Sequence, residues 1–408
     1  MDAQLLKSTF AVVERRAEHA VTYFYSHLFW NNPRVRELFP ADMAPQRDRL
    51  FAALTHVVTH LDDPALGEYL GQLGRDHRKF LATPALYSAV GASLLAAFAH
   101  ASGAAWSMEA EKAWTEAYGL VSDLMQAGAG RSAEAGQPAW WDADVVRHER
   151  YGPDLTLLTL RPRTPFPYLP GQYTSVSTPH APRIWRTYSL ANAPRPDGTV
   201  DLHIGRVEGG AMSTALSDRL RPGDTVRLSA PSGALTARTP PGKPRTYIAA
   251  GTGWAPIRAL LEEAATDEPA CEGRLFLVAR TREYLYGRAD AERLAAHIPG
   301  MRLTSITAAP RAPRGQATER LFQALRSGVN WPAHDVYLAG PPEFLTQVSS
   351  ILAGLGTDPV RIFHDRIPPI TRATTSTAPA RPMSLSERRM SRPSLHWHNP
   401  DARAPRAY

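Results

Sequence analysis

A glycine-rich turn in the second half of the chain could hold a phosphate group. Gly251-Thr252-Gly253 follows the short apolar segment Tyr247–Ala250 and precedes a helical pattern at Ala255–Ala265, with Pro256 in the first helical turn. Between a buried strand and a helix, glycine lets backbone N–H groups approach a phosphate, and the helix N-terminus favours the anion. The turn is a candidate nucleotide site; the alternative is a helix start that needs glycine only for its own geometry.

A second candidate site lies earlier in the chain, on an expected strand. The run Arg186-Thr187-Tyr188-Ser189-Leu190 is preceded by Pro170-Gly171-Gln172-Tyr173. An arginine at a strand edge can neutralise a pyrophosphate, and the residue two positions on faces the same side of the strand. The tyrosine ring and serine hydroxyl could then contact a flat isoalloxazine. Taken singly, Tyr188 is explained by ordinary strand packing and Arg186 by a surface charge; their ordered combination favours a flavin.

A third candidate is His77, in the helical first third of the chain, within the run from Gly74 to Phe80. A histidine imidazole can hold a metal ion, but a single histidine on a helix is a weak signal by itself. On residue type alone, His56, His60 and His100 are equivalent to it. A structural or solvent-exposed role is the alternative for each of these histidines.

The composition limits the chemistry that these sites can perform. The chain has 408 residues, of which 43% are apolar and 21% charged, an ordinary globular balance that favours two or three domains. Cys271 is the one cysteine, which excludes an internal disulfide, a thiolate zinc site and a four-cysteine iron–sulfur cluster. If the protein moves electrons, an organic cofactor or a histidine-held metal must carry them.

Charge and hydropathy bear on partners and location. Seven of the arginines lie in residues 370–408 against Glu387 and Asp401, so this segment carries most of the net charge of +7. We therefore expect no nucleic-acid binding by the folded part. The apolar runs fall short of the roughly 20 residues that span a bilayer. We expect no signal peptide, because Met1-Asp2-Ala3-Gln4 leads directly into a mixed helix. We expect a cytoplasmic protein with no membrane contact; its oligomeric state stays open.

The periodicity of apolar residues divides the chain into segments of different fold class. Residues 1–133 show helical spacing and predict an all-α domain of six to eight helices. Residues 138–236 alternate between turns and predict a small antiparallel β-barrel of six strands with one helix at Met212–Leu220. Residues 237–367 alternate strands with helices and predict a doubly wound α/β sheet. Residues 368–408 are rich in Pro and Arg and are expected to be disordered.

The ordered motifs of roughly residues 140–367 resemble those of the ferredoxin-NADP reductase superfamily. Besides the two runs above, they include Gly209–Ser213 and Gly340-Pro341-Pro342. The resemblance implies that FAD lies on the barrel and NAD(P)H on the α/β domain, with hydride passing from nicotinamide to flavin. The FAD contacts that it implies are Tyr173, Arg186, Thr187, Tyr188, Ser189, Gly209, Gly210 and Ser213. The nicotinamide-site residues that it implies are Gly251, Thr252, Gly253, Trp254, Ala255, Pro256, Arg280, Gly340 and Pro341.

Nearly all of residues 1–130 resemble the globin domain of bacterial flavohaemoglobins. The resemblance rests on Tyr23-Phe24-Tyr25, Leu38-Phe39-Pro40, Gln46 to Phe51, His77, Thr83 to Tyr87, and Ala113 to Gly119. It implies haem b with His77 as the proximal iron ligand and Tyr25 as a hydrogen-bond donor to bound O₂. Gln46 would be a second polar group, Phe39 would pack on the porphyrin and Leu50 would crowd the distal side.

Three departures from the family pattern affect the expected chemistry. Ala339 stands where the reductase family often has a cysteine, and Ile367 where flavohaemoglobins have a flavin-covering phenylalanine; Phe363 and His364 are possible substitutes. Tyr87 matches the tyrosine near the proximal histidine, but the usual glutamate position corresponds to Ala129. Without that carboxylate the imidazole should be less anionic. We predict a higher haem reduction potential than in proteins that have the proximal histidine, the tyrosine and the glutamate together.

The function implied by the two resemblances together is nitric oxide dioxygenation, with electrons passing from NAD(P)H through FAD to haem and NO and O₂ yielding nitrate. One alternative is an NAD(P)H:O₂ or other-acceptor oxidoreductase. Another is a haem-based gas or redox sensor with a weakened reductase. Arg280 and Arg282 follow the second strand of the α/β domain, where a positive charge could read a 2′-phosphate. They are equally explained as solvated loop arginines, so NADH versus NADPH stays open.

Overall fold

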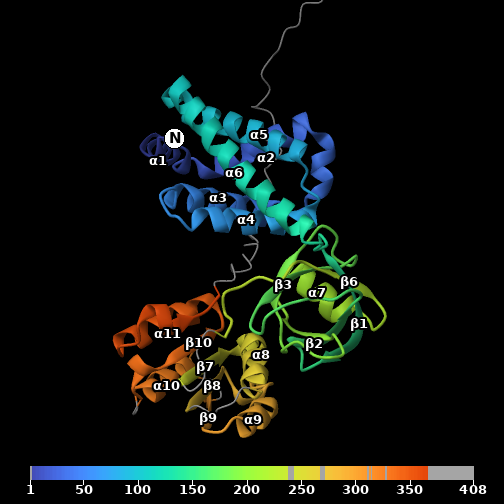
Figure 1. Cartoon of the computed structure of the whole chain (residues 1–408), viewed down its shortest axis with the longest axis vertical. Helices are drawn as coiled ribbons and strands as arrows, with labels where there is room; N and C mark the ends of the chain where they lie inside the picture. Colours follow the sequence, from blue (N-terminus) through green and yellow to red (C-terminus); the bar gives the residue numbers. More distant parts are fainter. Residues whose placement is uncertain are drawn as a thin grey trace, which may run out of the picture. The chain divides into compact units, whose positions relative to one another are not determined.

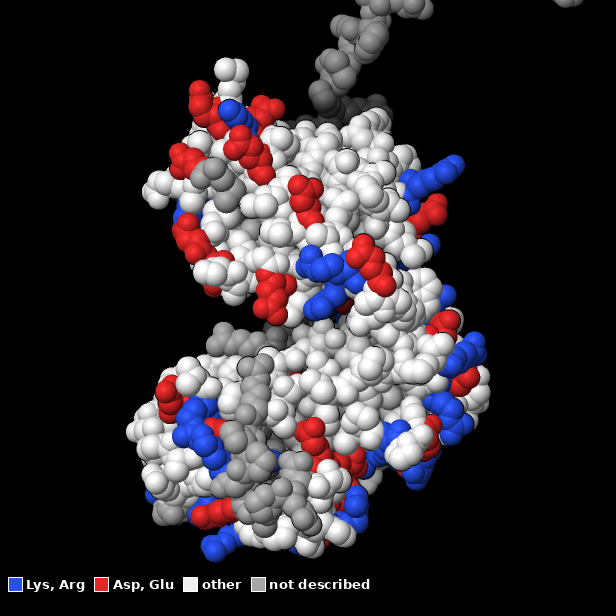
Figure 2. Space-filling view, viewed as in Figure 1, with Lys and Arg blue, Asp and Glu red and all other residues white. Residues whose placement is uncertain are grey.

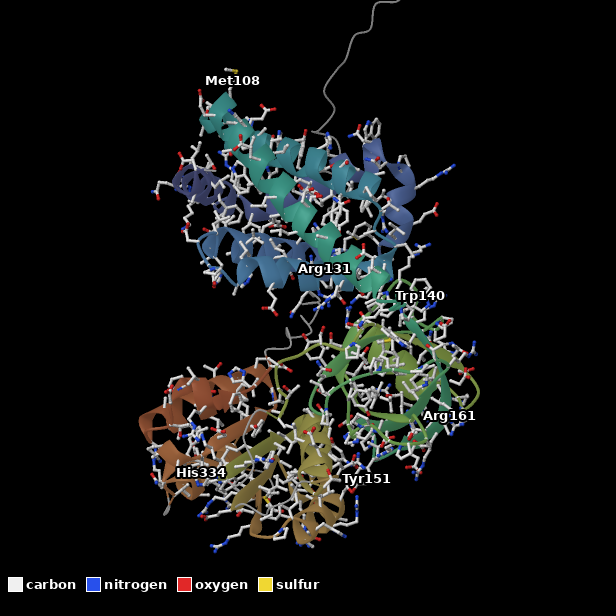
Figure 3. The ribbon with its side chains drawn as sticks, in the orientation of Figure 1. Met108, Arg131, Trp140, Tyr151, Arg161 and His334 are labelled. Atoms are coloured by element: carbon white, nitrogen blue, oxygen red, sulfur yellow. The ribbon has the colours of Figure 1, made fainter. Side chains whose placement is uncertain are left out.

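The computed structural model describes residues 2–237, 243–266, 272–309, 312–313, 315–326 and 329–365. The first segment is helical, as predicted: its elements are α1 (Ala3–Glu14), α2 (Ala17–Asn31), α3 (Ala44–Thr59), α4 (Leu66–His77), α5 (Pro84–Ser102) and α6 (Met108–Glu134). Side chains cap several helix starts, because Thr83 accepts from the Leu86 amide and Ser107 from the Ala110 amide. Figure 3 follows the longest of these helices, α6, from Met108 to Arg131.

The helical domain is held together by close contact between α4 and α6. An added Cβ on Gly74 would lie 1.9 Å from the Met125 carbonyl oxygen, and one on Gly128 would lie 2.2 Å from the Gly71 carbonyl oxygen. Only glycine permits two helix backbones to approach so closely. This crossing fixes the position of α4, and His77 is the last residue of that helix.

The long helix α5 is apolar enough for its length to match a membrane span, over Pro84–Ala105. In this protein its buried side chains, among them Leu94, Ala97 and Phe98, belong to the same apolar cluster as Phe10 and Trp114. It is therefore a core helix of the helical domain, flanked by α2 and α6.

The second segment is an antiparallel sheet that nearly closes into a barrel (Figure 1). Its strands are β1 (Trp141–Arg150), β2 (Leu155–Pro162), β3 (Tyr173–Ser177), β4 (Arg186–Ser189), β5 (Val200–Gly205) and β6 (Thr225–Leu228), in the order β4-β3-β6-β1-β2-β5. A bridge between Leu190 and Leu202 joins the two edge strands. The expected helix begins as α7 (Ala211–Thr214) and continues as a π-helical turn over Ala215–Arg219. The barrel prediction is confirmed.

The third segment is a parallel sheet with helices on both faces, as predicted. Its elements are β7 (Arg245–Ala250), α8 (Trp254–Ala264), β8 (Gly273–Ala279), α9 (Arg288–His297), β9 (Met301–Thr307), α10 (Gln316–Leu325), β10 (Asp335–Ala339), α11 (Pro342–Gly354) and β11 (Ile362–Phe363). The strand order is β11-β10-β7-β8-β9. Successive residues of β7 lie on opposite faces of the sheet. Tyr247 packs with α8 and α9 on one face, and Ile248 packs with α10 and α11 on the other. The short edge strand β11 was not predicted.

Several sequence predictions concern residues outside the described ranges. These are the lone Cys271, Ile367 at the flavin-covering position, and the whole Pro/Arg-rich segment 368–408. On the face that Figure 2 presents, Lys and Arg side chains are interspersed with Asp and Glu among broad areas of other residues. That view displays mixed charge over the described helices and strands, and the expectation on nucleic acid stays a prediction.

Candidate functional site: three linked cofactor sites

His77 ends α4 with one ring nitrogen committed to the backbone. Its Nδ1 lies 2.7 Å from the Leu73 carbonyl oxygen, one helical turn earlier. A donor bond from Nδ1–H fixes the tautomer and leaves Nε2 as a lone-pair donor, the arrangement that metal-ligating histidines use. Burial lowers the pKa of His77, which keeps the imidazole neutral. The structure therefore equips this histidine to hold iron.

The predicted distal residues gather around Tyr25. The tyrosine is 7% exposed, and its ring stands edge-on to Phe39 at 5.6 Å between centroids. Its hydroxyl donates to the backbone carbonyl of Gln46 over 3.4 Å, a long bond that a better acceptor could replace. Burial raises the pKa of Tyr25, so the hydroxyl keeps its proton. Leu50 packs against the same apolar cluster.

The burial pattern of α3 fits a large apolar group beside it. Among its sixteen residues Val58 is the one buried residue, while Leu50, Phe51, Leu54 and Val57 remain half-buried. Leu54 belongs to the cluster of Tyr25, whereas Val57 belongs to a separate cluster with Tyr87. A helix with half-exposed apolar side chains facing two separate clusters is suited to cover a flat prosthetic group between them. The residues present fit haem.

Tyr87 lies on the proximal side with its hydroxyl unused. Its Oη atom is buried and has no hydrogen-bond partner in the described part of the chain. Its cluster contains Leu70 and Met125 and is otherwise apolar around the ring. A carboxylate partner for this hydroxyl is absent from the described residues, in keeping with alanine at position 129.

The barrel site combines the guanidinium of Arg186 with small hydroxyl groups. Within the described ranges no carboxylate pairs with Arg186, whose guanidinium is half-buried and donates to the Trp185 carbonyl over 2.9 Å. Burial lowers its pKa, and a bound anion would relieve that cost. Tyr188 lies on the same strand with its pKa raised by burial. In the sheet register Ser189 pairs with Tyr173, whose burial raises its pKa to about 12. The site fits the pyrophosphate and ring of FAD.

The loop before α7 is a tight turn. Gly209 has a positive φ of 69°, and an added Cβ on Gly210 would lie 2.8 Å from the Ser213 hydroxyl oxygen. That hydroxyl accepts from the Val207 amide over 3.1 Å and is buried. Ser213 therefore shapes the turn, and contacts to a ligand here would come from the backbone of Gly209 and Gly210. Thr187, on β4, approaches the Ser175 hydroxyl at 3.5 Å.

The two glycine motifs of the α/β domain meet at the point where the strand order reverses. Strands β7 and β10 are neighbours, and β8 lies on the other side of β7. An added Cβ on Gly253 would lie 2.3 Å from the Ala339 carbonyl oxygen, and one on Gly340 would lie 2.7 Å from the Phe344 ring. In open parallel sheets the nucleotide binds at this crevice. The side chains of Trp254, Ala255 and Pro256 are buried, so a ligand would meet the turn Gly251-Thr252-Gly253 and the backbone beside Pro341.

The arginines that could read a 2′-phosphate are exposed. Arg280 follows β8, and its guanidinium lies 4.6 Å from the Tyr284 ring centroid. Arg282 begins the 3₁₀ turn Arg282–Tyr284. Phe363, a possible substitute for the flavin-covering aromatic, packs on Tyr337 at 5.2 Å between centroids.

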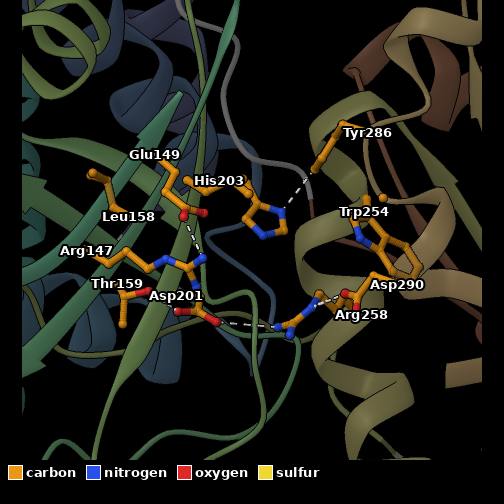
Figure 4. Close-up of a pocket in the computed structure, with 12 residues that line it drawn as sticks. Arg147, Glu149, Leu158, Thr159, Asp201, His203, Trp254, Arg258, Tyr286 and Asp290 are labelled. Carbon is orange, nitrogen blue, oxygen red and sulfur yellow. Dashed lines mark hydrogen bonds and ion pairs between the residues drawn. The ribbon is translucent and has the colours of Figure 1, made fainter. Parts of the chain in front are cut away.

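A cavity of about 230 Å³ lies between the barrel strands and α8 (Figure 4). The sequence did not predict this cavity. Arg258 from α8 pairs there with Glu262 at 2.7 Å and with Asp290 and Asp201. In Figure 4 His203 and Tyr286 point toward each other, and His203 Nδ1 lies 3.0 Å from the Tyr286 hydroxyl. Burial, with help from Arg258, lowers the pKa of His203 to about 4. The ion pair between Arg258 and Asp201, at 3.7 Å, joins the α/β domain to the barrel.

Comparison with known proteins agrees with the three segments. The globin family model matches residues 22–125, the oxidoreductase FAD-binding domain matches 142–236, and the oxidoreductase NAD-binding domain matches 247–350. The prediction of haem, FAD and a nicotinamide dinucleotide is thus confirmed at the level of domains.

Curated relatives match along nearly their full length. The flavohemoprotein of Bordetella pertussis is 28% identical over 385 residues, covering 88% of this chain and 95% of the relative. That of Deinococcus radiodurans is 29% identical over 393 residues, covering 90% and 96%. Among solved structures, a flavohemoglobin from Malassezia yamatoensis with bound FAD and heme has a TM-score of 0.73 at 20% identity, covering 89% and 97%; it bears on the fold. The chain thus combines segments that match the globin, oxidoreductase FAD-binding and oxidoreductase NAD-binding families, and over nearly its whole length it is similar to flavohemoproteins.

Proposed function

We propose that this protein is a nitric oxide dioxygenase that draws electrons from NAD(P)H and converts NO and O₂ to nitrate. One combination of residues carries the proposal. The backbone orients the imidazole of His77, and the same domain buries the protonated hydroxyl of Tyr25 among apolar side chains. The reductase half adds Arg186, which has no carboxylate partner among the residues that the structure describes, and a glycine turn at the sheet switch point. Together these features support the proposal.

The reductase residues would bind and orient the two nucleotides. Arg186 would neutralise the FAD pyrophosphate, while Tyr188 and Ser189 would contact the flavin ring, with Tyr173 on the adjacent strand. Backbone N–H groups of Gly251-Thr252-Gly253 would hold the nicotinamide dinucleotide, and Gly340 would leave room beside them. Bound FAD supplies the conversion of a hydride into single electrons, and bound haem supplies O₂ binding and one-electron reduction.

The globin residues would hold the iron and polarise the gas site. His77 would ligate through Nε2 while Leu73 fixes its ring. The Tyr25 hydroxyl would donate to the negatively polarised oxygen, and this donation carries more weight in a site without water. Phe39 and Leu50 would exclude water, and Gln46 would provide the second polar side chain. No residue of the chain has to act as a general base.

The deciding experiment compares NO consumption by the holoprotein with NADH under air and under argon. Nitrate formed only in the presence of O₂, with NADH oxidised in parallel, supports the proposal. Equal NO loss in both atmospheres, or no nitrate, refutes it.

An NAD(P)H:acceptor oxidoreductase is the second candidate, because Tyr87 has no hydrogen-bond partner among the described residues and the proximal carboxylate is missing. NADH oxidation that is independent of NO and produces superoxide would favour it. A haem-only preparation without flavin would favour the sensor interpretation. Steady-state rates with NADH and NADPH would decide the role of Arg280.

A further inference from the structure

A buried lysine two residues after His77 joins the helical domain to the barrel. Lys79, in the 3₁₀ turn Arg78–Phe80 that follows α4, is 8% exposed. Its Nζ lies 2.5 Å from an Asp76 carboxylate oxygen and donates to the Ser175 hydroxyl on β3 over 3.3 Å. A buried ammonium is costly unless it is paired and hydrogen-bonded. Lys79 finds one partner on each domain.

The same ammonium lies against two aromatic rings, one from each domain. Lys79 Nζ is 5.2 Å from the Phe80 ring centroid and 5.5 Å from the Trp185 ring centroid. The two rings meet edge to face at 6.5 Å, and Phe80 in turn stands edge-on to His77 at 5.8 Å. Each cation–ring contact is attractive, more so when desolvated. A continuous series of contacts thus runs from His77 to Trp185.

The barrel end of this cluster lies on the residues assigned to flavin. Trp185 directly precedes Arg186, and its carbonyl accepts the Arg186 guanidinium bond. Ser175 pairs in register with Thr187, and their hydroxyl oxygens are 3.5 Å apart. Lys79 therefore contacts β3 through Ser175, and through Trp185 it contacts the residue that directly precedes β4.

We propose that Lys79, together with Phe80 and Trp185, holds the helix that ligates haem against the flavin strands and thereby sets the rate of electron transfer between the two cofactors. The proposal rests on the proposed electron route and not on the identity of the gas substrate. In each transfer one electron leaves the reduced flavin and is accepted by ferric haem. No bond forms in the three residues and none of them is oxidised. Lys79 is a positioning residue, and its effect is exerted through distance and orientation.

The test separates the two half-reactions in the anaerobic holoprotein by stopped flow. Lys79→Met should leave flavin reduction by NADH within about twofold of wild type, while flavin-to-haem transfer slows by about tenfold or more, because small displacements of reacting centres have large rate effects. Trp185→Leu should behave in the same way. Lys79→Arg, which keeps the positive charge, should retain most of the wild-type rate of flavin-to-haem electron transfer. Lys7→Met is the matched control, since Lys7 forms a 2.7 Å ion pair with Asp62 on the exposed helical surface.

A second readout does not depend on activity. Hydrogen–deuterium exchange should increase in Lys79→Met at residues 78–81, 173–177 and 184–187 together, and not in Lys7→Met. Unchanged haem reduction and unchanged exchange in both Lys79→Met and Trp185→Leu would overturn the proposal. If the chain transfers electrons to haem but forms no nitrate, the proposed function fails while the role of Lys79 still stands or falls on these rates.

Discussion

The Nδ1 atom of His77 lies 2.7 Å from the carbonyl oxygen of Leu73, so a backbone group of α4 fixes the ring that would hold iron. A neutral carbonyl is a weaker acceptor than a carboxylate, and it makes the imidazole a weaker electron donor. The close crossing of α4 and α6 at Gly74 and Met125 holds this helical turn in place. The proximal side of the site is therefore defined by backbone contacts and apolar packing.

Replacing His77 should remove the pigment without disturbing the reductase. His77→Ala deletes the iron ligand, so the purified protein should lose most of its haem while retaining FAD. Absorbance at the Soret band measures the bound haem, and the flavin released on denaturation measures the bound FAD. His100→Ala, an exposed histidine on α5, is the control and should keep its haem. Full haem binding in His77→Ala would contradict the assignment.

Removing the Tyr25 hydroxyl should weaken O₂ retention. Tyr25→Phe keeps the ring in its contact with Phe39 but deletes the donor, and a hydrogen bond to a charged acceptor contributes about 1.5–3 kcal/mol. The O₂ dissociation rate should therefore rise by roughly 10- to 100-fold. Stopped-flow displacement of O₂ by CO measures it, and a rate equal to that of wild type would exclude Tyr25 as the donor.

The Tyr87 hydroxyl should prove dispensable. Because Oη is buried with no partner in the described structure, Tyr87→Phe removes an unsatisfied polar group, which is neutral or stabilising by up to about 1 kcal/mol. The haem midpoint potential should not change. Thermal unfolding and a redox titration check the two expectations. A marked fall in stability or a shifted potential would mean that the hydroxyl acquires a partner when haem is bound.

Gly253→Ala should damage the nucleotide site selectively. The added methyl group would lie 2.3 Å from the Ala339 carbonyl oxygen, and overpacking of this kind costs about 1–3 kcal/mol. Flavin reduction by NADH should be strongly impaired while haem and FAD remain bound. Gly354→Ala, where an added Cβ meets nothing within 4 Å, should reduce flavin normally. Equal rates in the two variants would place the nucleotide elsewhere.

Acidification should loosen the contact between barrel and α/β domain through His203. Its pKa of about 4 in the folded protein lies below its ordinary value of 6.5, so the unfolded chain binds the additional proton. Stability from this group is complete above about pH 6.5 and declines as the pH falls toward 4, by about 2 kcal/mol between pH 7 and 5. Between pH 7 and pH 5, the His203→Gln variant should lose less of its free energy of unfolding than wild type. Urea unfolding at the two pH values measures the difference. The same acid sensitivity in the variant would exclude His203 as the source.

Sequence patterns predicted the elements because apolar periodicity and turn residues are local properties. The six strands of the barrel and the alternation after Arg245 were recognisable, since each depends on a few neighbouring residues. The edge strand Ile362–Phe363 escaped prediction because two residues carry no period of their own. Gly253 and Gly340 were singled out by motif. The reason that Gly253 must be glycine is contact with Ala339 on a strand distant in sequence, whereas Gly340 is constrained by the ring of Phe344, four residues later.

The candidate site was predictable where a motif is continuous in sequence, and not where it is assembled from distant segments. His77, Arg186 and the glycine turn were proposed as site residues in that way, and they stay predictions. The contact of Lys79 with Ser175 joins residues 96 positions apart, and Lys79 looked like any solvated charge beside His77. Only the fold reveals that this lysine is buried between two rings.

The central claim is that electrons travel from nicotinamide through flavin to an iron held by His77. The most direct measurement mixes the oxidised holoprotein with NADH under argon and records the whole visible spectrum over time. We expect loss of the flavin bands followed by conversion of the Soret band to its ferrous position. Flavin bleaching with a Soret band that stays ferric would contradict it.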